Sequence, residues 1–409
     1  MSRLSAEAVV IGGGAAGMLC SAVAAGRGLD VILLEPNKIL GRKLRITGKG
    51  RCNVTNNCDI REFLNNIPSD GRFLYSALNR LSPRDTMELF ESLGLRLKTE
   101  RGNRVFPVSD NANDVAGALQ RYMNRAGVRV VHSLAKHIIT EDNSVTGVET
   151  GDGIIECRAA VICTGGLSYP LTGSKGAGYK MAEELGHTVT PRRPSLVPLE
   201  SDDDYCAEMQ GFSLKNVALS AYEDGKIIYN ELGEMLFTHF GVSGPLVLSA
   251  SSHMRSFGEA RYELRIDLKP GLDEKKLDAR LLRDFEKYAN RDFANSLGDL
   301  AGKAMIPVLV RLSGIPAETK VNSITREQRH ALLKLIKNFP VSISGPRPID
   351  EAIVTSGGVS TKEINPRTMQ SKRIGGLYFA GEVMDLDAYT GGFNLQIAWS
   401  TAYVAANSI

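Results

Sequence analysis

Residues 8–17 read Ala-Val-Val-Ile-Gly-Gly-Gly-Ala-Ala-Gly. An apolar run rich in β-branched residues leads into three glycines, and an alanine-rich segment follows. A buried strand, a tight turn and a helix explain this order. The spacing Gly12-x-Gly14-x-x-Gly17 lets the turn close, the backbone approach a pyrophosphate and the helix pack close to its strand. We therefore expect a dinucleotide-binding turn.

The next apolar segment strengthens this prediction. Residues 30–35, Asp-Val-Ile-Leu-Leu-Glu, are typical of a second buried strand and close a βαβ unit of about thirty residues. The acid at its end, Glu35, would accept hydrogen bonds from ribose hydroxyls. An acid here favours an unphosphorylated ribose, as in FAD or NAD, over NADP at this site.

Length and charge limit the architecture and the partners. A chain of 409 residues exceeds what one hydrophobic core usually serves, so we expect two or more lobes. Its 49 basic and 46 acidic residues give a net charge of +3. This leaves little surplus for the basic surface that nucleic-acid binding needs. We expect a small-molecule substrate and no nucleic acid, and the composition favours no particular oligomeric state.

The cysteines and the first apolar run indicate the cellular compartment of the protein. Six cysteines show no C-x-x-C pair: Cys20, Cys52, Cys58, Cys157, Cys163 and Cys206. We therefore expect no metal site and a reducing cytoplasm. The uncharged run from Ala8 to Gly26 could span a bilayer by length, but its glycines fit a strand-turn-helix better. We expect neither a membrane span nor a secretory signal.

The character of the chain changes near Pro191. From residue 191 to 272 short strands alternate with turns, which predicts a small antiparallel barrel or sandwich. From 273 to 339 the pattern is helical, and after Pro340 an apolar strand and an alanine-rich helix return. We predict an α/β domain of the Rossmann type from residues 1–190 and 340–409, interrupted by a β-barrel (191–272) and a helical domain (273–339).

Two later segments separate FAD from NAD. Cys163-Thr164-Gly165-Gly166 and the run Gly376-Leu-Tyr-Phe-Ala-Gly381-Glu382 resemble the middle and late FAD motifs of glutathione-reductase-type flavoproteins. In those proteins the late acid meets the ribityl chain. Three separated motifs in the right order are harder to obtain by accident than one, so the resemblance implies FAD.

Further segments narrow the resemblance to one family. They are Gly41-Arg42-Lys43, residues 47–56 (TGKGRCNVTN), 237–245 (FTHFGVSGP), 354–359 (VTSGGV), 381–387 (GEVMDLD) and 391–396 (GGFNLQ). Together they resemble a bacterial FAD flavoprotein family whose members are described as NAD(P)/FAD-dependent, aminoacetone-oxidase-like or dehydro-bile-acid-reductase-like. The resemblance spans nearly the whole chain and implies an FAD-dependent oxidoreductase with a β-barrel and a helical insertion.

The motifs and the resemblance together assign the cofactor contacts. The residues assigned to FAD are Gly12, Gly14, Ala16, Gly17, Glu35, Arg42, Lys43, Thr47, Gly48, Gly50, Arg51, Cys52, Asn53, Thr164, Gly165, Gly381, Glu382, Asp387, Gly392, Phe393, Asn394 and Leu395. The last three open the final helix, whose free N–H groups would face the N1/C2-carbonyl edge of the flavin. We expect Gln396 and Trp399 to serve helix packing or to lie on the surface.

The segment from Thr47 to Asn53 carries misleading patterns. Gly48-Lys49 lacks the earlier glycine and the following serine or threonine of a nucleotide-triphosphatase loop. Cys52 has no partner cysteine at the spacing that disulfide reductases use. By the resemblance this loop runs along the flavin, and Arg51 is the residue in it that we would mutate first.

The catalytic group is less defined. His239 lies in the motif-like Thr238-His239-Phe240-Gly241 and could donate a proton or contact substrate, although a structural histidine is more common. The sequence departs from the family pattern at two positions: Ala388 stands where a glycine is expected, and Phe393 replaces a tyrosine. By the resemblance, Ala388 would tighten a turn beside the flavin.

Several functions remain open. The first is an oxidoreductase that takes hydride from NAD(P)H and reduces a small organic substrate at flavin N5. The second is an oxidase of a small amine or carbonyl compound, and others are an RNA-modifying flavoprotein and a non-catalytic flavin-binding regulator. Gly173-x-x-Gly176-x-Gly178 does not follow an expected strand, so we expect no separate nicotinamide domain, and NAD(P)H would bind transiently.

Overall fold

A computed structural model describes residues 4–409. The chain forms two compact units: one comprises the chain up to Ser195 together with Ile349–Ile409, and the other is Leu196–Pro348. The first unit is therefore built from both ends of the chain. The expected barrel and helical segments fall together in the second unit, and the finer three-way division stays a prediction.

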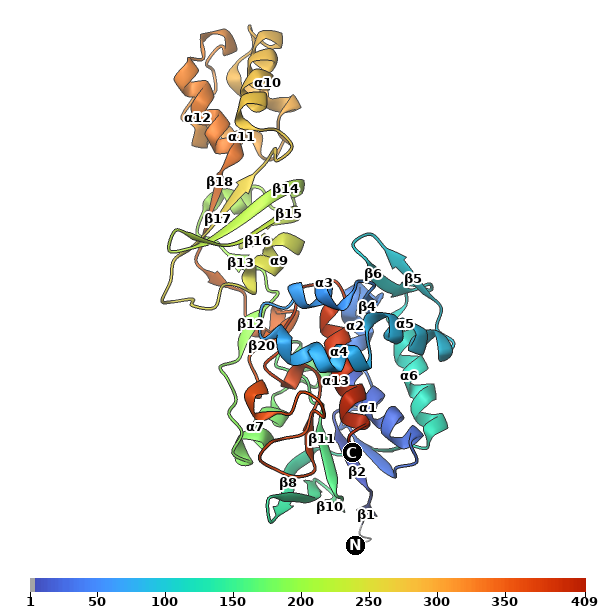
Figure 1. Cartoon of the computed structure of the whole chain (residues 1–409). Coiled ribbons are helices and arrows are strands. Elements are labelled where there is room, and N and C mark those ends of the chain that lie inside the picture. The colour runs from blue at the N-terminus through green and yellow to red at the C-terminus, as the bar shows by residue number, and fades with distance from the viewer. Residues whose placement is uncertain (1–3) are drawn as a thin grey trace. The chain divides into compact units, whose positions relative to one another are not determined.

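A five-stranded parallel sheet forms the centre of the first unit (Figure 1). Its strands, in spatial order, are β21 (Leu377–Phe379), β11 (Ala159–Ile162), β2 (Ala8–Ile11), β3 (Val31–Leu34) and β7 (Arg129–Val131). β2, β3 and β11 are buried along their whole length, which their apolar sequences allow. Leu377 pairs with Ala160, so the last part of the chain completes the sheet that the first part begins. The predicted α/β fold is confirmed.

Three long helices pack together in the first unit. They are α1 (Ala15–Gly26), α6 (Ala112–Ala126) and α13 (Phe393–Ala406), with α1 between the other two. α13 lies against α1 in the middle of the unit (Figure 1). It is buried nearly all round, as expected for a helix rich in apolar and small residues. Trp399 is fully buried and donates Nε1–H to the Val54 carbonyl, which confirms its packing role.

Smaller elements surround this core. Between β3 and β7 they are α2 (Arg42–Ile46), η1 (Thr47–Gly50), β4 (Thr55–Asn56), α3 (Ile60–Asn65), η2 (Gly71–Leu74), α4 (Tyr75–Arg80), α5 (Pro83–Ser92), β5 (Leu97–Glu100) and β6 (Arg104–Pro107). A second sheet contains β1 (Leu4–Ser5), β8 (Ala135–Glu141), β9 (Ser144–Thr150) and β10 (Gly153–Glu156). After β11 follow η3 (Pro170–Thr172), α7 (Ala177–Glu184) and β12 (Arg193–Ser195), which pairs with β20 (Val354–Ser356). The short turns η7 (Ile349–Glu351), η8 (Thr361–Glu363) and η9 (Gly381–Val383) complete the unit.

The second unit combines one sheet with helices. Its seven-stranded antiparallel sheet contains β13 (Leu199–Glu200), β14 (Ser213–Glu223), β15 (Lys226–Thr238), β16 (Gly241–Ser243), β17 (Tyr262–Asp267), β18 (Phe339–Ile343) and β19 (Gly345–Pro346). Its helices are α8 (Asp204–Glu208), α9 (Pro245–Ser251), α10 (Glu274–Lys287), α11 (Ile306–Ser313) and α12 (Arg326–Lys337), with turns η4 (Phe293–Asn295), η5 (Leu297–Asp299) and η6 (Val321–Ser323). Sheet and helices share one hydrophobic core. Among residues 4–409, no helix combines the length and apolarity needed to cross a membrane.

Candidate functional site

The turn between β2 and α1 is shaped by its glycines. Gly12 has a φ of 106°, and a Cβ there would lie 2.6 Å from the Cys163 carbonyl oxygen. A Cβ on Gly17 would lie 1.8 Å from the Gly12 oxygen, so this position permits the close strand-helix contact. Gly14 meets nothing within 4 Å. Two glycines therefore close the turn, while the third leaves open space at the N-terminus of α1, where an anion is favoured.

Glu35 is tied to this turn. Its Oε2 accepts the Gly13 backbone N–H at 2.8 Å, and its Oε1 accepts the backbone and side-chain N–H groups of Asn37 at 2.9 and 2.6 Å. The carboxylate is partly exposed and an ionised carboxylate has about four acceptor positions. One acceptor position is left after these three bonds. This geometry leaves room for a ribose hydroxyl.

Thr164 and Gly165 lie directly beside the same turn. Thr164 Cα would be 3.0 Å from a Cβ on Gly12. Thr164 Oγ1 is buried and has no hydrogen-bond partner within the protein. Gly165 has a φ of 72°, so the chain bends sharply after β11. A buried hydroxyl without a partner is costly unless a ligand satisfies it.

Glu382 enters the site from the late segment. A Cβ on Gly381 would lie 3.0 Å from Ala16 Cβ, so this segment sits against the first turn of α1. Glu382 Oε2 lies 2.7 Å from Lys43 Nζ, and Oε1 accepts the Thr355 N–H at 2.9 Å. Ser168 is buried and accepts a hydrogen bond from Lys43 at 2.7 Å. An ion pair with both side chains 21% exposed therefore stands next to the glycine turn.

The loop from Thr47 to Asn53 has unusual backbone angles. Gly48, Lys49, Gly50 and Cys52 have φ values of 57°, 57°, 82° and 59°. Such angles are costly for the two residues that are not glycine, and strain of this kind concentrates at functional sites. Asn53 Oδ1 is buried and has no partner within the protein.

The side chains of this loop differ in what they can do. Thr47 Oγ1 donates to the Leu44 carbonyl at 2.7 Å. Cys52 is fully buried, and burial raises the pKa of its thiol to about 12. A protonated buried thiol is inert at neutral pH. Cys52 therefore contributes its backbone and its packing rather than a thiolate.

The two predicted arginines are already engaged. Arg51 Nη2 lies 2.5 Å from both Glu100 Oε1 and Asp110 Oδ1, and its guanidinium stacks 4.1 Å from the Phe106 ring centroid. Arg42 Nη1 donates to Asn37 Oδ1 at 2.7 Å. Arg51 thus forms an ion-pair cluster with two acids from outside its own loop. A direct contact between Arg51 and the cofactor stays a prediction.

The N-terminus of α13 is entered through two glycines. Gly391 and Gly392 have φ values of 124° and 100°, and a Cβ on Gly392 would lie 2.4 Å from the Thr55 carbonyl. No side chain caps this helix end. The backbone N–H groups of Phe393–Leu395 therefore lack intrahelical acceptors, and they carry the positive end of the helix dipole. The Asn394 side chain instead bonds both the N–H and the carbonyl of Ala388, at 3.0 and 2.7 Å.

Asp387 is a fully buried carboxylate in the preceding loop. Ser195 Oγ donates to its Oδ2 at 2.8 Å, and Ser356 Oγ donates to its Oδ1 at 3.2 Å. These serines end β12 and β20, so Asp387 fixes the loop before α13 to that strand pair. The sequence prediction placed Asp387 at the cofactor, and in the structure its carboxylate serves at least this structural role.

His239 is exposed at the turn between β15 and β16, in the second unit. Its ring lies 5.0 Å from the Phe240 ring in an edge arrangement. The predicted cofactor residues all lie in the first unit. A role for His239 as proton donor stays a prediction.

FAD fits the group of residues that the first unit brings together. The open space at Gly14 leaves room for a pyrophosphate, and Glu35 has one acceptor position left for a ribose hydroxyl. The buried oxygens of Thr164 and Asn53, which have no partner within the protein, offer two further hydrogen bonds. The uncapped start of α13 offers donors to an electron-rich ring edge.

Comparison with known proteins identifies the chain. Residues 6–408 match the family described as HI0933-like protein Rossmann domain. The protein belongs to this family. The HI0933-like chain is accordingly an FAD-dependent oxidoreductase, as the resemblance in sequence implied.

Three similar proteins illustrate the range of this fold. Ribosomal RNA dihydrouridine synthase from Escherichia coli strain K12 is 33% identical over 409 residues, covering 98% of each chain. The 3-dehydro-bile acid delta(4,6)-reductase of Clostridium scindens is 29% identical, also over 98% of each chain. The solved structure of 3-ketosteroid delta1-dehydrogenase from Sterolibacterium denitrificans has a TM-score of 0.54 at 13% identity, over 98% of this chain and 99% of that one. This last likeness is one of fold.

Sequence reasoning missed several members of the site in this HI0933-like protein. Ser168 and Thr355 hold the Lys43–Glu382 pair, and Ser195 and Ser356 hold Asp387. Thr355 and Ser356 lie in the segment 354–359, which carries part of the family resemblance but predicts no role for either residue. Serine and threonine are common on any surface, so only the fold singles these four out.

Proposed function

We propose that this protein is an FAD-dependent reductase that saturates a carbon–carbon double bond conjugated to a carbonyl group. The observation that carries the proposal is the uncapped, glycine-entered N-terminus of α13 within the same unit as the Gly12–Gly17 turn. When bound, FAD supplies two-electron hydride chemistry at its N5 atom.

The chain's own residues would hold and polarise the cofactor. Glu35 would bind ribose hydroxyls, and the N-terminus of α1 would bind the pyrophosphate. Lys43 would lie near the phosphates and Glu382 near the ribityl hydroxyls. The N–H groups of Phe393–Leu395 would stabilise the negative charge that gathers beside them on reduction.

The two similar enzymes favour a conjugated acceptor. The name of the Clostridium scindens relative describes reduction of double bonds conjugated to a 3-oxo group. Dihydrouridine differs from uridine by one reduced double bond, which is also conjugated to a carbonyl. With such an acceptor, hydride would add to the carbon β to the carbonyl, a proton would add to the α carbon, and the carbonyl would withdraw the electrons. We propose this chemistry here, with NAD(P)H as the transient reductant and His239 as a candidate proton donor.

A stopped-flow experiment with matched acceptors tests the proposal. The holoprotein is reduced anaerobically with NADPH or NADH, and flavin absorbance is followed after addition of cyclohex-2-enone or cyclohexene. The enone should reoxidise the flavin, whereas the unconjugated alkene should not. Equal rates with both would contradict the conjugation requirement.

The same experiment separates the reductase from an oxidase. An oxidase of a small amine would be bleached by the amine without NAD(P)H and would regain its colour in air. Bleaching by candidate amines combined with no response to NADH or NADPH would therefore replace our proposal.

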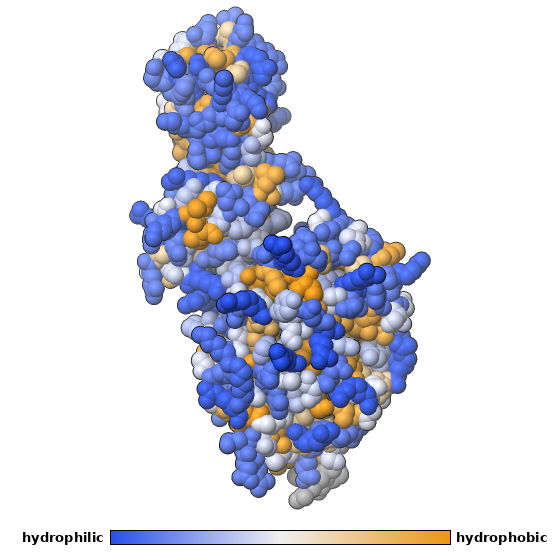
Figure 2. All heavy atoms as spheres, viewed as in Figure 1, coloured by the Kyte–Doolittle hydropathy of each residue, from blue (hydrophilic) through white to orange (hydrophobic). Residues whose placement is uncertain are grey.

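A second candidate is the same reduction on a uracil base in RNA. The relative named Ribosomal RNA dihydrouridine synthase matches along 98% of this chain. Residues 273–339 also contain thirteen lysines and arginines against nine acids, a larger surplus than the whole chain has. Hydrophilic side chains cover most of the visible face of the α10–α12 segment (Figure 2). Several lysines and arginines of this segment, Lys287, Lys320 and Arg329 among them, form ion pairs with acids, so contacts to phosphates would fall to the rest.

The near-neutral overall charge led us to expect no nucleic acid, so this candidate needs its own test. Reduced protein is incubated with a uracil-containing ribosomal RNA fragment and with free uridine, and dihydrouridine is measured by mass spectrometry. Product in the RNA but not in uridine would favour the RNA substrate. No product in either, together with turnover of the enone, would favour a small molecule.

A further inference from the structure

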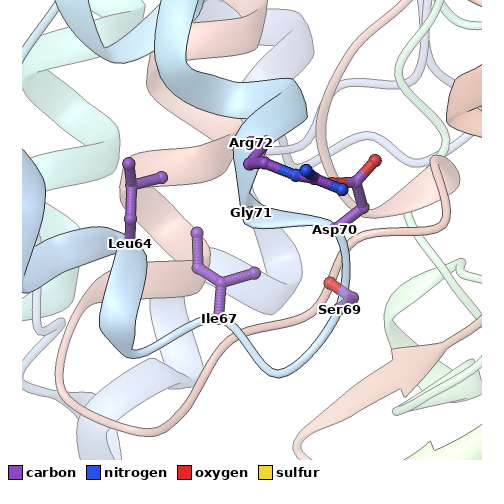
Figure 3. Close-up of a pocket in the computed structure, with 6 residues that line it drawn as sticks. All are labelled: Leu64, Ile67, Ser69, Asp70, Gly71 and Arg72. Atoms are coloured by element: carbon purple, nitrogen blue, oxygen red, sulfur yellow. The ribbon is translucent and has the colours of Figure 1, made fainter.

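A pocket opens in the first unit beside the helices between β4 and α5. It has a volume of about 400 Å³ and is lined by Leu64, Ile67, Ser69, Asp70, Gly71 and Arg72. Figure 3 shows the apolar side chains of Leu64 and Ile67 on one side and the charged side chains of Asp70 and Arg72 on the other. This volume lies within the range of small-molecule sites, about 300–1,000 Å³.

The wall of this pocket is joined to the loop that leads into α13. The Asn66 carbonyl accepts the Tyr389 N–H at 3.0 Å. Ser69 Oγ lies 3.3 Å from the Asp387 carbonyl oxygen and 3.4 Å from its N–H. One turn earlier, the Phe63 ring packs edge-on against Phe393, the first residue of α13, at 5.1 Å between centroids. The pocket is therefore anchored next to the helix end that we assign to the flavin ring.

The charges at the pocket are loosely paired. The Arg72 side chain is 97% exposed, and Arg72 Nε lies 3.7 Å from Asp70 Oδ1. This distance is too long for a hydrogen bond, so the pair is a weak surface contact. A guanidinium has five donors and forms two parallel bonds with a carboxylate or a phosphate. Arg72 can exchange Asp70 for a ligand anion at small cost.

We propose that this pocket is a substrate subsite that takes an apolar group ending in an anion, either a carboxylate or a phosphate. Leu64 and Ile67 contact the apolar part, and Arg72 binds the anion. Asp70 competes with the ligand for Arg72. The inference rests on the proposed function, because the subsite would bind the anionic end of the substrate whose double bond is reduced at the flavin.

Ligand binding to the oxidised holoprotein tests the subsite without any turnover. The first probe pair is 4-carboxycinnamaldehyde and its methyl ester, and the second is cinnamyl phosphate and cinnamyl alcohol. Binding is read from the change in the flavin absorbance spectrum. In each pair that the site accepts, the anion should bind about fivefold more tightly, the effect of one favourable ion pair. A preference in only one pair identifies the anion as carboxylate or phosphate.

Variants then show whether Arg72 and Asp70 cause the preference for the anionic probe. Arg72→Ala should abolish the advantage of the anion, and Arg72→Lys should restore part of it. Asp70→Asn should increase the advantage, because it removes the competing carboxylate. Arg61→Ala is the matched control, since Arg61 is an exposed arginine on the neighbouring α3 outside the pocket lining. Flavin content and melting temperature are measured for each variant to show that it is folded.

The proposal is overturned if neither anion binds more tightly than its neutral partner. It is also overturned if Arg72→Ala keeps the full preference while folded with FAD bound. Failure of the proposed function looks different: the carboxylate probe would bind with the expected preference, yet the reduced flavin would not be reoxidised by it.

Discussion

Glu35 accepts a hydrogen bond from the backbone N–H of Gly13 at 2.8 Å, although 22 residues separate them in the chain. This hydrogen bond joins the end of β3 to the turn after β2. The acid is held in a fixed position before any ligand arrives, and this preorganisation lowers the cost of binding a ribose.

Replacing Glu35 by alanine should weaken FAD binding. Hydrogen bonds to a charged group contribute about 1.5–3 kcal/mol each, so the dissociation constant should rise at least about tenfold. Titration of the apoprotein with FAD, followed by flavin fluorescence, measures this. Glu88→Ala, at an exposed position of α5, is the control and should bind as the wild type does. Unchanged affinity in Glu35→Ala would remove Glu35 from the cofactor site.

Two glycines of the same turn should respond differently to alanine. A Cβ on Gly14 meets nothing within 4 Å and its φ is −84°, so Gly14→Ala should fold normally. Its methyl group would nevertheless stand where the backbone must approach the pyrophosphate, and we expect about tenfold weaker FAD binding or worse. Melting curves of the apoprotein and FAD titration separate the two effects.

Gly17→Ala should instead damage the fold. Its Cβ would lie 1.8 Å from the Gly12 oxygen, and the strand and helix would have to move apart. Overpacking of this kind costs about 1–3 kcal/mol or more. The apoprotein should melt several degrees lower, and a Gly17→Ala variant as stable as Gly14→Ala would contradict the close contact between the turn and its helix.

Cys52 should resist alkylation in the native protein. Burial raises the pKa of its thiol to about 12, so almost none is thiolate at pH 8. Mass spectrometry after iodoacetamide treatment should find Cys52 unmodified in the folded protein and modified in urea. Rapid labelling without denaturant would show that the loop opens, and would revive a thiol-based role.

Glu363 should contribute to acid sensitivity. Burial alone would raise the pKa of Glu363, but hydrogen bonds from Arg373 and Thr188 outweigh it and lower the pKa to about 2. The ordinary value of 4.5 applies when the chain unfolds. The stabilisation is therefore present above pH 4.5 and is lost as the pH falls from 4.5 toward 2.

Urea unfolding of wild type and Glu363→Gln at several pH values checks this window. The wild type should be more stable at pH 7, and the difference should disappear near pH 2. Glu141→Gln, at an exposed carboxylate, serves as the control. A difference that stays constant from pH 7 to pH 2 would contradict the depressed pKa of Glu363.

Local sequence patterns were sufficient for the strands, the glycine turn and the acid. The apolar runs at 8–11 and 31–34 form buried parallel strands, and Glu35 meets the turn as expected. These features depend on the periodicity of apolar side chains and on the backbone freedom of glycine. Both can be read from a short stretch of sequence.

Charged side chains were harder to predict. Arg51 looks like a ligand contact within its own loop, but β5 and the segment after β6 bring Glu100 and Asp110 to it. Likewise, serines from β12 and β20 hold Asp387 in place, and the sequence around Asp387 does not predict these contacts. A long polar side chain takes whichever partner the fold places within reach.

Local sequence was enough to predict a Rossmann-type turn with an acid partner, because a few residues in two successive segments specify that geometry. The fold alone shows that Ser168 and Thr355 hold the Lys43–Glu382 pair and that Ser195 and Ser356 hold Asp387. It also revealed the pocket beside Arg72. The physical reason is that such sites arise from parallel strand pairing and helix packing between distant segments, and these interactions leave no local pattern in the sequence.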